Sequence, residues 1–399
     1  MMRQAKPSVT RFFRLAAAAG ALAMAAACAG GPANRGADDP SAAAEPQVDP
    51  VAPVAVAILA PTTAGSESLR RAAQDLVAAA QLARAERAPE NLVLKVYDTK
   101  GTGQGAAAAT AKALADGSAM IVGPLLGASA KAAGPVAAQR GVNMLAFSND
   151  ETAAGGNVWV LGPLVRDELE RLFGYAGARG LSQIAVAYPA NRYGQVVASE
   201  AEQAASASGV AVGPFFAYER SVEGIAGAVG EGVEAMQASA VDGVLIADRG
   251  DALRFIAKAF AGNGVGQPEV RYLGLGVWDD PRNGDEPAMH GGWFVGGDPT
   301  ADAVFERRFR SRMGRAPHPA AATAYDAVAA AAAMLRDAAA GGEPAFTRRA
   351  ITRGRGFEGA AGGFRLLGDG TNRRSLAVKS VAPGGSRVLD AAPRGAPAS

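Results

Sequence analysis

The chain has 399 residues, which is long for one hydrophobic core and suits two lobes of ordinary size. Hydrophobic residues make up 49% and charged residues 20%, the balance of a globular protein. A net charge of +2, with 40 Lys and Arg against 38 Asp and Glu, gives no electrostatic basis for binding nucleic acid.

The amino terminus has the features of a secretory signal peptide. A positively charged leader is followed by an unbroken run of apolar and small residues at 15–27. This run is too short to cross a membrane as a helix, but it fits the core of a cleavable leader. Residues 1–27 are therefore predicted to be removed on export, into the cell envelope.

Cys28 is the only cysteine of the chain and follows this run directly. A single thiol in an exported protein has no partner for an internal disulfide. The string Ala25-Ala26-Ala27-Cys28 resembles the bacterial lipobox, whose cysteine is lipidated, although Leu is usual at the position of Ala25. The resemblance implies a lipid anchor, and Ala29 after the cysteine favours the outer membrane if the organism is Gram-negative. The alternative is a plain cleavable leader that leaves an unused cysteine.

The next segment, 28–53, is rich in Ala, Pro, Gly and Asp without periodicity and is predicted to be a flexible tether. After it, short β-branched and apolar runs alternate with Ala-rich stretches whose apolar residues recur at helical spacing. The expected strands are 54–59, 92–97, 120–122, 142–147 and 158–161. The expected helices are 66–87, 105–115 and 129–140. This alternation predicts a parallel sheet with helices on both faces.

The same alternation starts again after Gly162-Pro163, so the body consists of two similar halves. The expected helices of the second half are 167–178, 195–208, 225–238 and 252–261. Its expected strands are 184–188, 210–217, 241–247 and 271–276. A strand at 293–295, helices at 301–312 and 320–340, a hairpin within 354–381 and a disordered tail at 382–399 complete the chain. The predicted fold class is α/β, with two doubly wound parallel sheets.

Short strings along the body resemble the type I periplasmic binding proteins, the leucine-binding family. They include Pro61-Thr62-Thr63, Ile121-Val122-Gly123-Pro124, Leu145-Ala146-Phe147-Ser148-Asn149, Tyr193-Gly194, Tyr325-Asp326 and Asp369-Gly370. Each string is weak alone, but their order from 54 to about 381 is specific. The resemblance implies two Rossmann-like lobes joined by three hinge crossings, with lobe 1 at 54–163 plus 298–340 and lobe 2 at 164–297 plus 341–381.

Within that family, the strings at 122–126 and 145–148 are most similar to the penicillin-binding protein activators. Some members of that branch are outer-membrane lipoproteins that stimulate peptidoglycan synthases, while other relatives capture amino acids for ABC transporters. The main hypothesis is therefore a non-catalytic envelope lipoprotein whose partner is a peptidoglycan synthase. The alternative is a solute receptor that delivers an amino-acid-like small molecule to an ABC permease.

Ligands of open parallel sheets bind beyond the carboxyl ends of the strands. The loops so placed are 61–66, 123–129, 147–150, 189–194, 248–251 and 277–280. Two lobes closing over these loops would enclose a small solute. The predicted ligand-binding residues on or beside these loops are Thr63, Ser129, Ser148, Asn149, Asp150, Tyr193, Asp248 and Trp278.

An amino acid would require two charged partners in this set. Ser129, at a helix start, with Ser148 and Asn149 suits its carboxylate, and Asp150 or Asp248 suits its ammonium, with Asp279 as a further candidate. Tyr193 and Trp278 are candidates to pack on an apolar side chain. The structural alternatives are helix capping for Ser129 and turn or capping roles for Asp150 and Asp248.

Two departures weaken the prediction of a simple amino-acid receptor. Arg70 stands where relatives often carry a small residue, and the first loop lacks an aromatic residue. The glycines at 101–105 match a dinucleotide fingerprint poorly, since Ala106 stands where the third glycine belongs.

Nothing in the sequence points to catalysis. The chain has two histidines, His290 and His318, both beside Gly or Pro, and it has no nucleophile elbow, paired-His metal motif or cysteine nucleophile. The prediction is that the chain is not an enzyme and needs no cofactor or metal.

Overall fold

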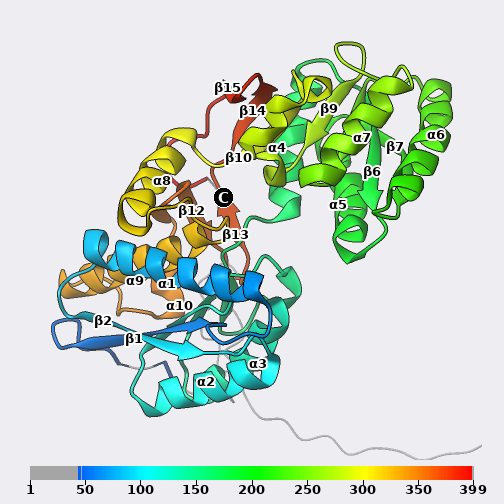
Figure 1. Cartoon of the computed structure of the whole chain (residues 1–399). Coiled ribbons are helices and arrows are strands. Elements are labelled where there is room, and N and C mark those ends of the chain that lie inside the picture. Colours follow the sequence, from blue (N-terminus) through cyan, green and yellow to red (C-terminus); the bar gives the residue numbers. More distant parts are fainter. Residues whose placement is uncertain (1–43, 46, 398–399) are drawn as a thin grey trace, which may run out of the picture. The chain divides into compact units, whose positions relative to one another are not determined.

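The computed structural model describes residues 44–45 and 47–397 (Figure 1). The predicted signal peptide, Cys28 and most of the predicted tether lie outside the described residues. Residues 47–53 are described, and part of this stretch is hydrogen-bonded to the first lobe. The Asn91 side chain donates to the carbonyls of Pro50 and Ala52 at 2.9 and 2.8 Å. The tether prediction is therefore wrong for the stretch just before 54, which is fixed to the body.

The first lobe contains a five-stranded parallel sheet in the order β2-β1-β3-β4-β5. Its strands are β1 (Val54–Ala60), β2 (Leu92–Asp98), β3 (Met120–Val122), β4 (Met144–Ala146) and β5 (Val158–Val160). The helices between them are α1 (Glu67–Arg87), α2 (Gly103–Ala115) and α3 (Gly127–Ala138). The short 3-10 turn η1 (Glu151–Ala153) precedes β5.

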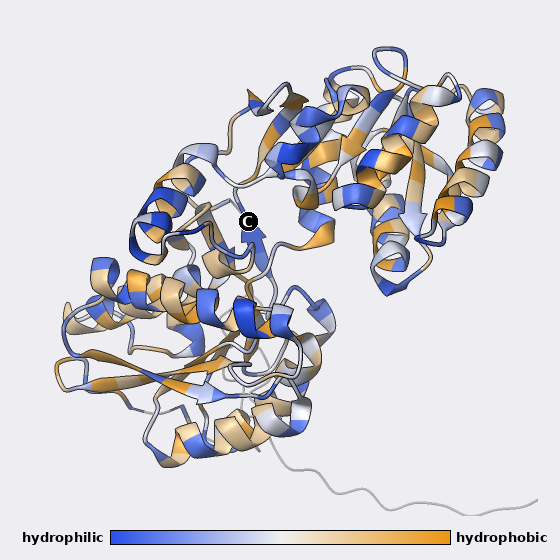
Figure 2. Cartoon of the chain, in the orientation of Figure 1, coloured by the Kyte–Doolittle hydropathy of each residue, from blue (hydrophilic) through white to orange (hydrophobic). Residues whose placement is uncertain are grey.

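Both faces of this sheet are buried, which explains the unbroken apolar run of β1. Val56 and Ile58 face one core, which they share with α1 and α9 (Ala321–Ala339). Ala57 and Leu59 face the other core, together with α2 and α3. Alternate residues of a strand point to opposite faces, so a strand covered on both sides must be apolar throughout. Figure 2 shows β1 as a mainly hydrophobic arrow.

The second lobe has a seven-stranded sheet in the order β15-β14-β10-β9-β8-β6-β7. Its strands are β6 (Gln183–Pro189), β7 (Ala211–Tyr218), β8 (Gly243–Ile246), β9 (Arg271–Gly274), β10 (Trp293–Gly296), β14 (Ala377–Ala382) and β15 (Gly385–Asp390). Its helices are α4 (Val165–Ala178), α5 (Arg192–Ser208), α6 (Val222–Ala238) and α7 (Gly250–Gly262). The 3-10 turns η2 (Gly276–Trp278), η3 (Pro281–Asp285) and η4 (Pro287–Met289) lie between β9 and β10.

Helices again cover both faces of the second sheet. One core contains residues of α4 and α5, and the other contains residues of α6 and α7. Strands β6 to β10 are parallel, while β14 and β15 are antiparallel additions at one edge. The predicted fold class, two doubly wound parallel-sheet lobes, is confirmed, and the antiparallel edge is an addition to it.

The remaining elements return to the first lobe before the last two strands. They are α8 (Pro299–Met313), α9, α10 (Arg348–Ile351), β11 (Phe357–Gly359), β12 (Gly362–Leu366) and β13 (Asn372–Arg374). Strands β11 to β13 form a separate antiparallel sheet. The chain passes between the lobes three times, after β5, after β10 and after β13.

The lobe boundaries differ from the prediction at the third crossing. Ala345, Phe357 and Phe364 are buried in the core that contains α1 and α9, so the segment after 340 continues lobe 1. The chain returns to lobe 2 only at β14. The predicted disordered tail is also wrong for β15, because it pairs with β14. The sequence predicted a hairpin within 354–381 but could not show which sheet its strands join.

Candidate functional site

The first loop of lobe 1, after β1, is fixed by its own side chains. Thr63 is exposed, and its backbone N–H and hydroxyl both donate to the Asp98 carboxylate at the end of β2. Burial raises the pKa of Asp98, but the hydrogen bonds from Thr63 and Lys100 outweigh it and lower the pKa to about 2. The Arg70 guanidinium donates to the carbonyls of Ala64 and Gly65 at 2.7 and 2.8 Å. Thr63 and Arg70 therefore both order this loop.

The second loop of lobe 1 leads from β3 into α3. Leu126 occupies the N-cap position, and no side chain caps the helix. Ser129, in the first turn, is 1% exposed. Its side chain is therefore closed off from a solute in this structure. Helix capping, the alternative considered for Ser129, is not what the structure shows, and the N–H groups of the first turn lack a side-chain acceptor.

The third loop of lobe 1 follows β4. Ser148 is buried, and its hydroxyl accepts from the Asp150 N–H at 3.0 Å. Asn149 is exposed. Asp150 caps η1 through the Thr152 N–H, lies 3.1 Å from the Lys131 Nζ, and packs so closely on Gly127 that a Cβ there would overlap it. This confirms the turn role considered for Asp150 and leaves its carboxylate paired.

In lobe 2, two predicted residues follow the neighbouring strands β6 and β8. Tyr193 is half-buried in the first turn of α5, and burial raises the pKa of its phenol, with the charges of Glu168 and Asp248 adding to the effect. Asp248 is 3% exposed. It accepts from the Tyr218 hydroxyl at 2.9 Å and from the Arg249 N–H at 2.8 Å, and it pairs with Arg220 at 2.8 Å.

Trp278 does not face these loops. It is 1% exposed, its Nε1 donates to the Ile246 carbonyl at 3.0 Å, and its ring lies against Phe294 with centroids 6.5 Å apart. A Cβ on Gly274 would overlap the indole, so the glycine makes room for it. The 3-10 turn η2 directs the side chain into the core, where it cannot pack on a solute in this structure.

Glu168 and Arg249 were not predicted as site residues, and His318 was named only as one of the two histidines. Glu168, in the first turn of α4, is buried and accepts from the Gly276 N–H at 3.1 Å. Burial raises its pKa to about 7, against the lowering effect of that hydrogen bond. Burial lowers the pKa of His318, and so does the charge of Arg249, while Asp75 raises it.

Arg249 itself is exposed at the N-cap of α7, and no side chain caps that helix. Among the described residues, its guanidinium forms no ion pair or hydrogen bond. Its charge influences both Tyr193 of lobe 2 and His318, which precedes α9 of lobe 1. The rule that selected the loop 248–251 could have identified Arg249, had charge been considered for each loop residue.

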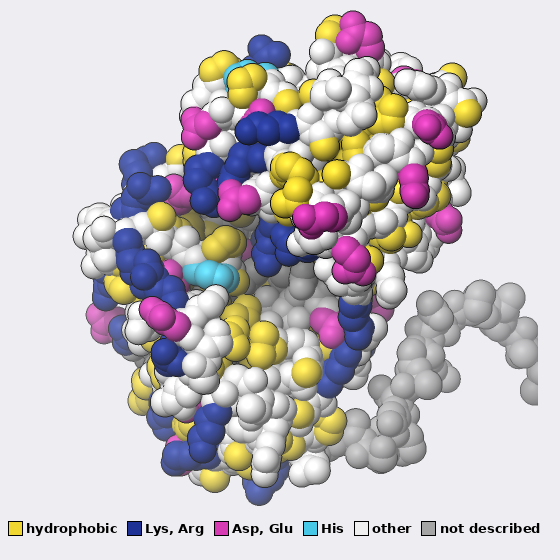
Figure 3. All heavy atoms as spheres, turned by 45° about the vertical axis from the view of Figure 1, so that its right-hand side comes forward, with side chains coloured by type: hydrophobic (Ala, Val, Ile, Leu, Met, Phe, Trp, Pro, Cys, Tyr) yellow, Lys and Arg dark blue, Asp and Glu magenta, His cyan; other side chains and the backbone are white. Residues whose placement is uncertain are grey.

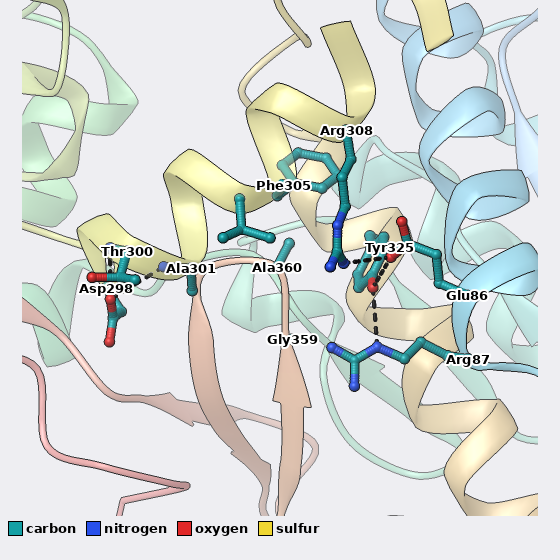
Figure 4. Close-up of a pocket in the computed structure, with 11 residues that line it drawn as sticks. Glu86, Arg87, Asp298, Thr300, Ala301, Phe305, Arg308, Tyr325, Gly359 and Ala360 are labelled. Atoms are coloured by element: carbon teal, nitrogen blue, oxygen red, sulfur yellow. Dashed lines mark hydrogen bonds and ion pairs between the residues drawn. The ribbon is translucent and has the colours of Figure 1, made fainter. Parts of the chain in front are cut away.

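A separate cavity of about 260 Å³ lies on lobe 1, away from the predicted residues. Figure 4 shows Tyr325 between Glu86 and Arg87, with Arg308 above them. The Tyr325 hydroxyl accepts from Arg87 at 3.1 Å and donates to Glu86 at 2.8 Å, and Arg308 donates to Glu86 at 2.9 Å. This cluster, in which two arginines share one glutamate through direct and Tyr325-mediated contacts, holds α1 against α8 and α9.

No group of residues suited to a metal ion is present in the described part of the chain. Of the glycines at 101–105, Gly103 and Gly105 lie in the first turn of α2, where the Thr102 hydroxyl already accepts from the Gly105 N–H at 3.0 Å. Among the described helices, none is long and apolar enough to span a membrane. On the surface drawn in Figure 3, dark blue Lys and Arg side chains are interspersed with magenta Asp and Glu.

The chain has the fold of several solved structures and matches one family sequence model, as follows. A comparison with curated proteins returns no match. A putative branched-chain amino acid ABC transporter protein from Rhodospirillum rubrum has the same fold, with a TM-score of 0.71, 17% identity, and coverage of 84% of this chain and 99% of that one. An ABC transporter substrate-binding protein from Desulfitobacterium hafniense, in complex with Leu, has a TM-score of 0.63, 22% identity, and coverage of 84% and 99%.

A third similar structure is a solute-binding protein of an ABC transporter from R. palustris in complex with benzoate. It has a TM-score of 0.62, 16% identity, and coverage of 86% of this chain and 98% of that one. A sequence model of the periplasmic binding protein family matches residues 53–386. The two lobes, the three crossings and this match over most of the chain agree, and the chain belongs to the type I periplasmic binding protein family.

Proposed function

We propose that the chain is the solute-binding component of an ABC transporter and that its solute carries a carboxylate. The observation that carries the proposal is the set of unpaired groups at the carboxyl ends of both sheets. Asn149 on lobe 1, and Tyr193 and Arg249 on lobe 2, have no side-chain hydrogen-bond or ion-pair partner among the described residues. All three can donate hydrogen bonds.

A carboxylate suits such a set because it is charged and only accepts hydrogen bonds. The uncapped start of α3 adds backbone N–H groups and the positive end of a helix dipole on lobe 1. Arg249 adds a full positive charge on lobe 2, at the equally uncapped start of α7. A solute contacted by both lobes would hold them together, as in hinge closure.

The structural neighbours favour this proposal over activation of a peptidoglycan synthase. Proteins similar to this chain are described as ABC transporter substrate-binding proteins, and two of them were determined with Leu or benzoate, both of which carry a carboxylate. None of the comparisons supports the activator branch or a synthase as partner. The expected partner is therefore an ABC permease, and binding rather than catalysis is the proposed activity.

The family match supports a location outside the cytoplasm. We propose in addition that Cys28 carries a lipid anchor, as its lipobox-like setting suggests. Mass spectrometry of the chain isolated from membranes would test this: an unmodified chain cleaved elsewhere would reject the anchor without affecting the proposed binding function.

The function can be tested by thermal unfolding of the mature chain with amino acids, aliphatic and aromatic acids, sugars and cell-wall fragments. A solute at a hundredfold excess over its Kd stabilises the native state by about 2.7 kcal/mol. A domain-sized protein then unfolds several degrees higher. Stabilisation by a carboxylate-bearing solute is expected. If no small solute raises the Tm and a peptidoglycan synthase is co-purified instead, the transporter proposal is wrong.

A further inference from the structure

We propose that Lys379 sets the balance between two arrangements of the lobes, by pairing with a carboxylate of lobe 2 in one and with a carboxylate of lobe 1 in the other. The two carboxylates are Asp279 and Asp302, and the three residues together are called the hinge triad. This role concerns the lobes themselves and goes beyond the proposed solute binding.

Lys379 is the buried cation of the hinge triad. It lies on β14, in the sheet of lobe 2, and is 3% exposed. On the neighbouring strand it is opposite Phe294 of β10, from which the chain leaves lobe 2 at the second crossing. A buried ammonium requires a negative partner, because without one the loss of its hydration is uncompensated.

The two acids of the hinge triad come from different lobes. The Lys379 Nζ lies 2.7 Å from Oδ2 of Asp279, which follows η2 in lobe 2. It lies 3.9 Å from Oδ2 of Asp302, in the first turn of α8. Helix α8 belongs to lobe 1, because its Phe305 and Phe309 are buried in the core that contains α1 and α9. Among the described residues, Lys379 forms ion pairs with these two carboxylates alone.

The two contacts respond differently to a rotation about the crossings. Lys379 and Asp279 are both in lobe 2, so their distance is kept when the lobes move as rigid bodies. The distance from Lys379 to Asp302 spans the two lobes and changes with the rotation. At 3.9 Å this contact is longer than a hydrogen bond, so a small rotation one way would form it and the other way would remove it. One ammonium therefore has two alternative partners.

Two glycines at the second crossing leave room for the hinge triad. A Cβ on Gly296 would lie 3.1 Å from both the Asp279 carboxylate and the Lys379 ammonium. A Cβ on Gly297 would lie 2.9 Å from the Asp302 carboxylate. The backbone that joins the lobes thus runs directly beside all three charged groups, and a change in its dihedral angles moves Asp302 relative to the other two.

The charge of Asp302 favours a closer cation than the structure gives it. The pKa of Asp302 is raised to about 7, chiefly by burial, with Asp279, Asp326 and Glu306 adding to the effect and Lys379 opposing it. A shorter contact with Lys379 would stabilise the charged carboxylate. Asp302 therefore competes with Asp279 for the one ammonium.

Distances between spin labels on the two lobes test this role in the absence of any solute. Cys28 is the only cysteine, so the mature chain carrying Cys28→Ser can be labelled at Ala108→Cys on α2 and Glu234→Cys on α6, both exposed positions. Asp302→Asn is expected to change the ratio of the two populations at least about fivefold, which corresponds to about 1 kcal/mol. Asp279→Asn, which frees the ammonium for Asp302, is expected to change it in the opposite direction.

Further variants connect these shifts to the shared cation. Lys379→Met removes it, so Asp302→Asn in that background is expected to have no additional effect. Asp302→Glu, which keeps the carboxylate, is expected to give populations close to those of the parent. Glu343→Gln is the matched control, since Glu343 pairs with Arg349 in lobe 1 and both side chains are exposed; it is expected to change nothing. Circular dichroism and the Tm of each variant establish that it is folded.

Opposite shifts in the two single variants separate this role from that of an ordinary structural ion pair, whose loss would lower the Tm without changing the distances. Shifts in the same direction, unchanged distances in Asp302→Asn, or an equal effect of Asp302→Asn with and without Lys379 would each overturn the inference. If Asp279→Asn does not fold, the comparison with and without Lys379 decides alone. These outcomes are independent of whether the chain binds a carboxylate, because no solute is present.

Discussion

A buried ion pair next to the crossings between the lobes is expected to contribute several kcal/mol to the free energy of unfolding. Asp326 of α9 is fully buried and lies 2.8 Å from Arg374 of β13, which is itself 8% exposed. Asp326 also accepts from the Ala360 N–H at 2.6 Å. Arg374 donates in turn to the carbonyl of Leu161, in the crossing after β5, at 2.6 and 3.1 Å. Asp326→Ala would leave a buried guanidinium and a buried N–H without their acceptor.

Removal of one partner of a buried pair costs about 3–5 kcal/mol, because the remaining charge is uncompensated. Each kcal/mol lowers the Tm of a domain of 150–250 residues by roughly 2–4 °C, and somewhat less in a longer chain. We therefore expect Asp326→Ala to lower the Tm by roughly 5–10 °C. Urea unfolding followed by circular dichroism would give the free energy of unfolding directly.

Glu306→Ala is the matched control, since it also removes a carboxylate from an arginine pair. Glu306 and Arg310 are 3.4 Å apart on α8, with side chains 51% and 57% exposed. An exposed pair of this spacing contributes about 0.3–0.5 kcal/mol. A loss below about 1 kcal/mol for Asp326→Ala, or equal losses for both variants, would refute the assignment of stability to this buried pair.

Three further predictions follow from single residues. Trp278→Ala should cost about 3–5 kcal/mol in free energy of unfolding, because it empties a core position; a loss under 1 kcal/mol would show that the indole is not buried. Glu168, with its pKa raised to about 7 from an ordinary value near 4.5, makes the folded state bind its proton more tightly than the unfolded state. Its contribution to stability is therefore lost as pH rises from about 4.5 through 7. Glu168→Gln, which keeps an acceptor for Gly276, should raise the Tm at pH 8 relative to the parent and change it little at pH 4.5; the opposite order contradicts the burial argument. Asp98, with its pKa lowered to about 2, stabilises the fold above pH 4 and loses that effect as pH falls to 2, so Asp98→Asn should flatten the acid limb of the stability profile.

The sequence predicted the repeated α/β pattern because that pattern depends on local spacing. The apolar run of β1 and the small residues of α1 and α9 are buried where the periodicity indicated. The assignment of 341–374 to lobe 2 was wrong because a strand's own residues do not specify which sheet it joins. β15 was predicted to be disordered because it lies near the end of the chain, and the pairing with β14 that orders it cannot be read from its own residues.

The candidate site was predictable as a set of loops but less so as a set of side chains. The rule that ligands bind beyond the carboxyl ends of parallel strands was enough to indicate the loops that contain Ser129 and Tyr193. Whether a polar group is available depends on its neighbours in space, and the pairings of Asp150 and Asp248 join residues distant in sequence. Trp278 was predicted at the site because its loop lies there, but η2 turns its side chain into the core.

The central claim is that one solute is held by donors from both lobes. Calorimetric titration of a binding carboxylate-bearing solute into Asn149→Ala, which changes lobe 1, and Arg249→Gln, which changes lobe 2, tests it most directly. Both variants are expected to bind at least several-fold more weakly than the parent. The control Arg307→Gln, which removes an exposed charge on α8, is expected to bind as well as the parent. Unchanged affinity in either Asn149→Ala or Arg249→Gln, with the fold intact, would contradict a solute shared between the lobes.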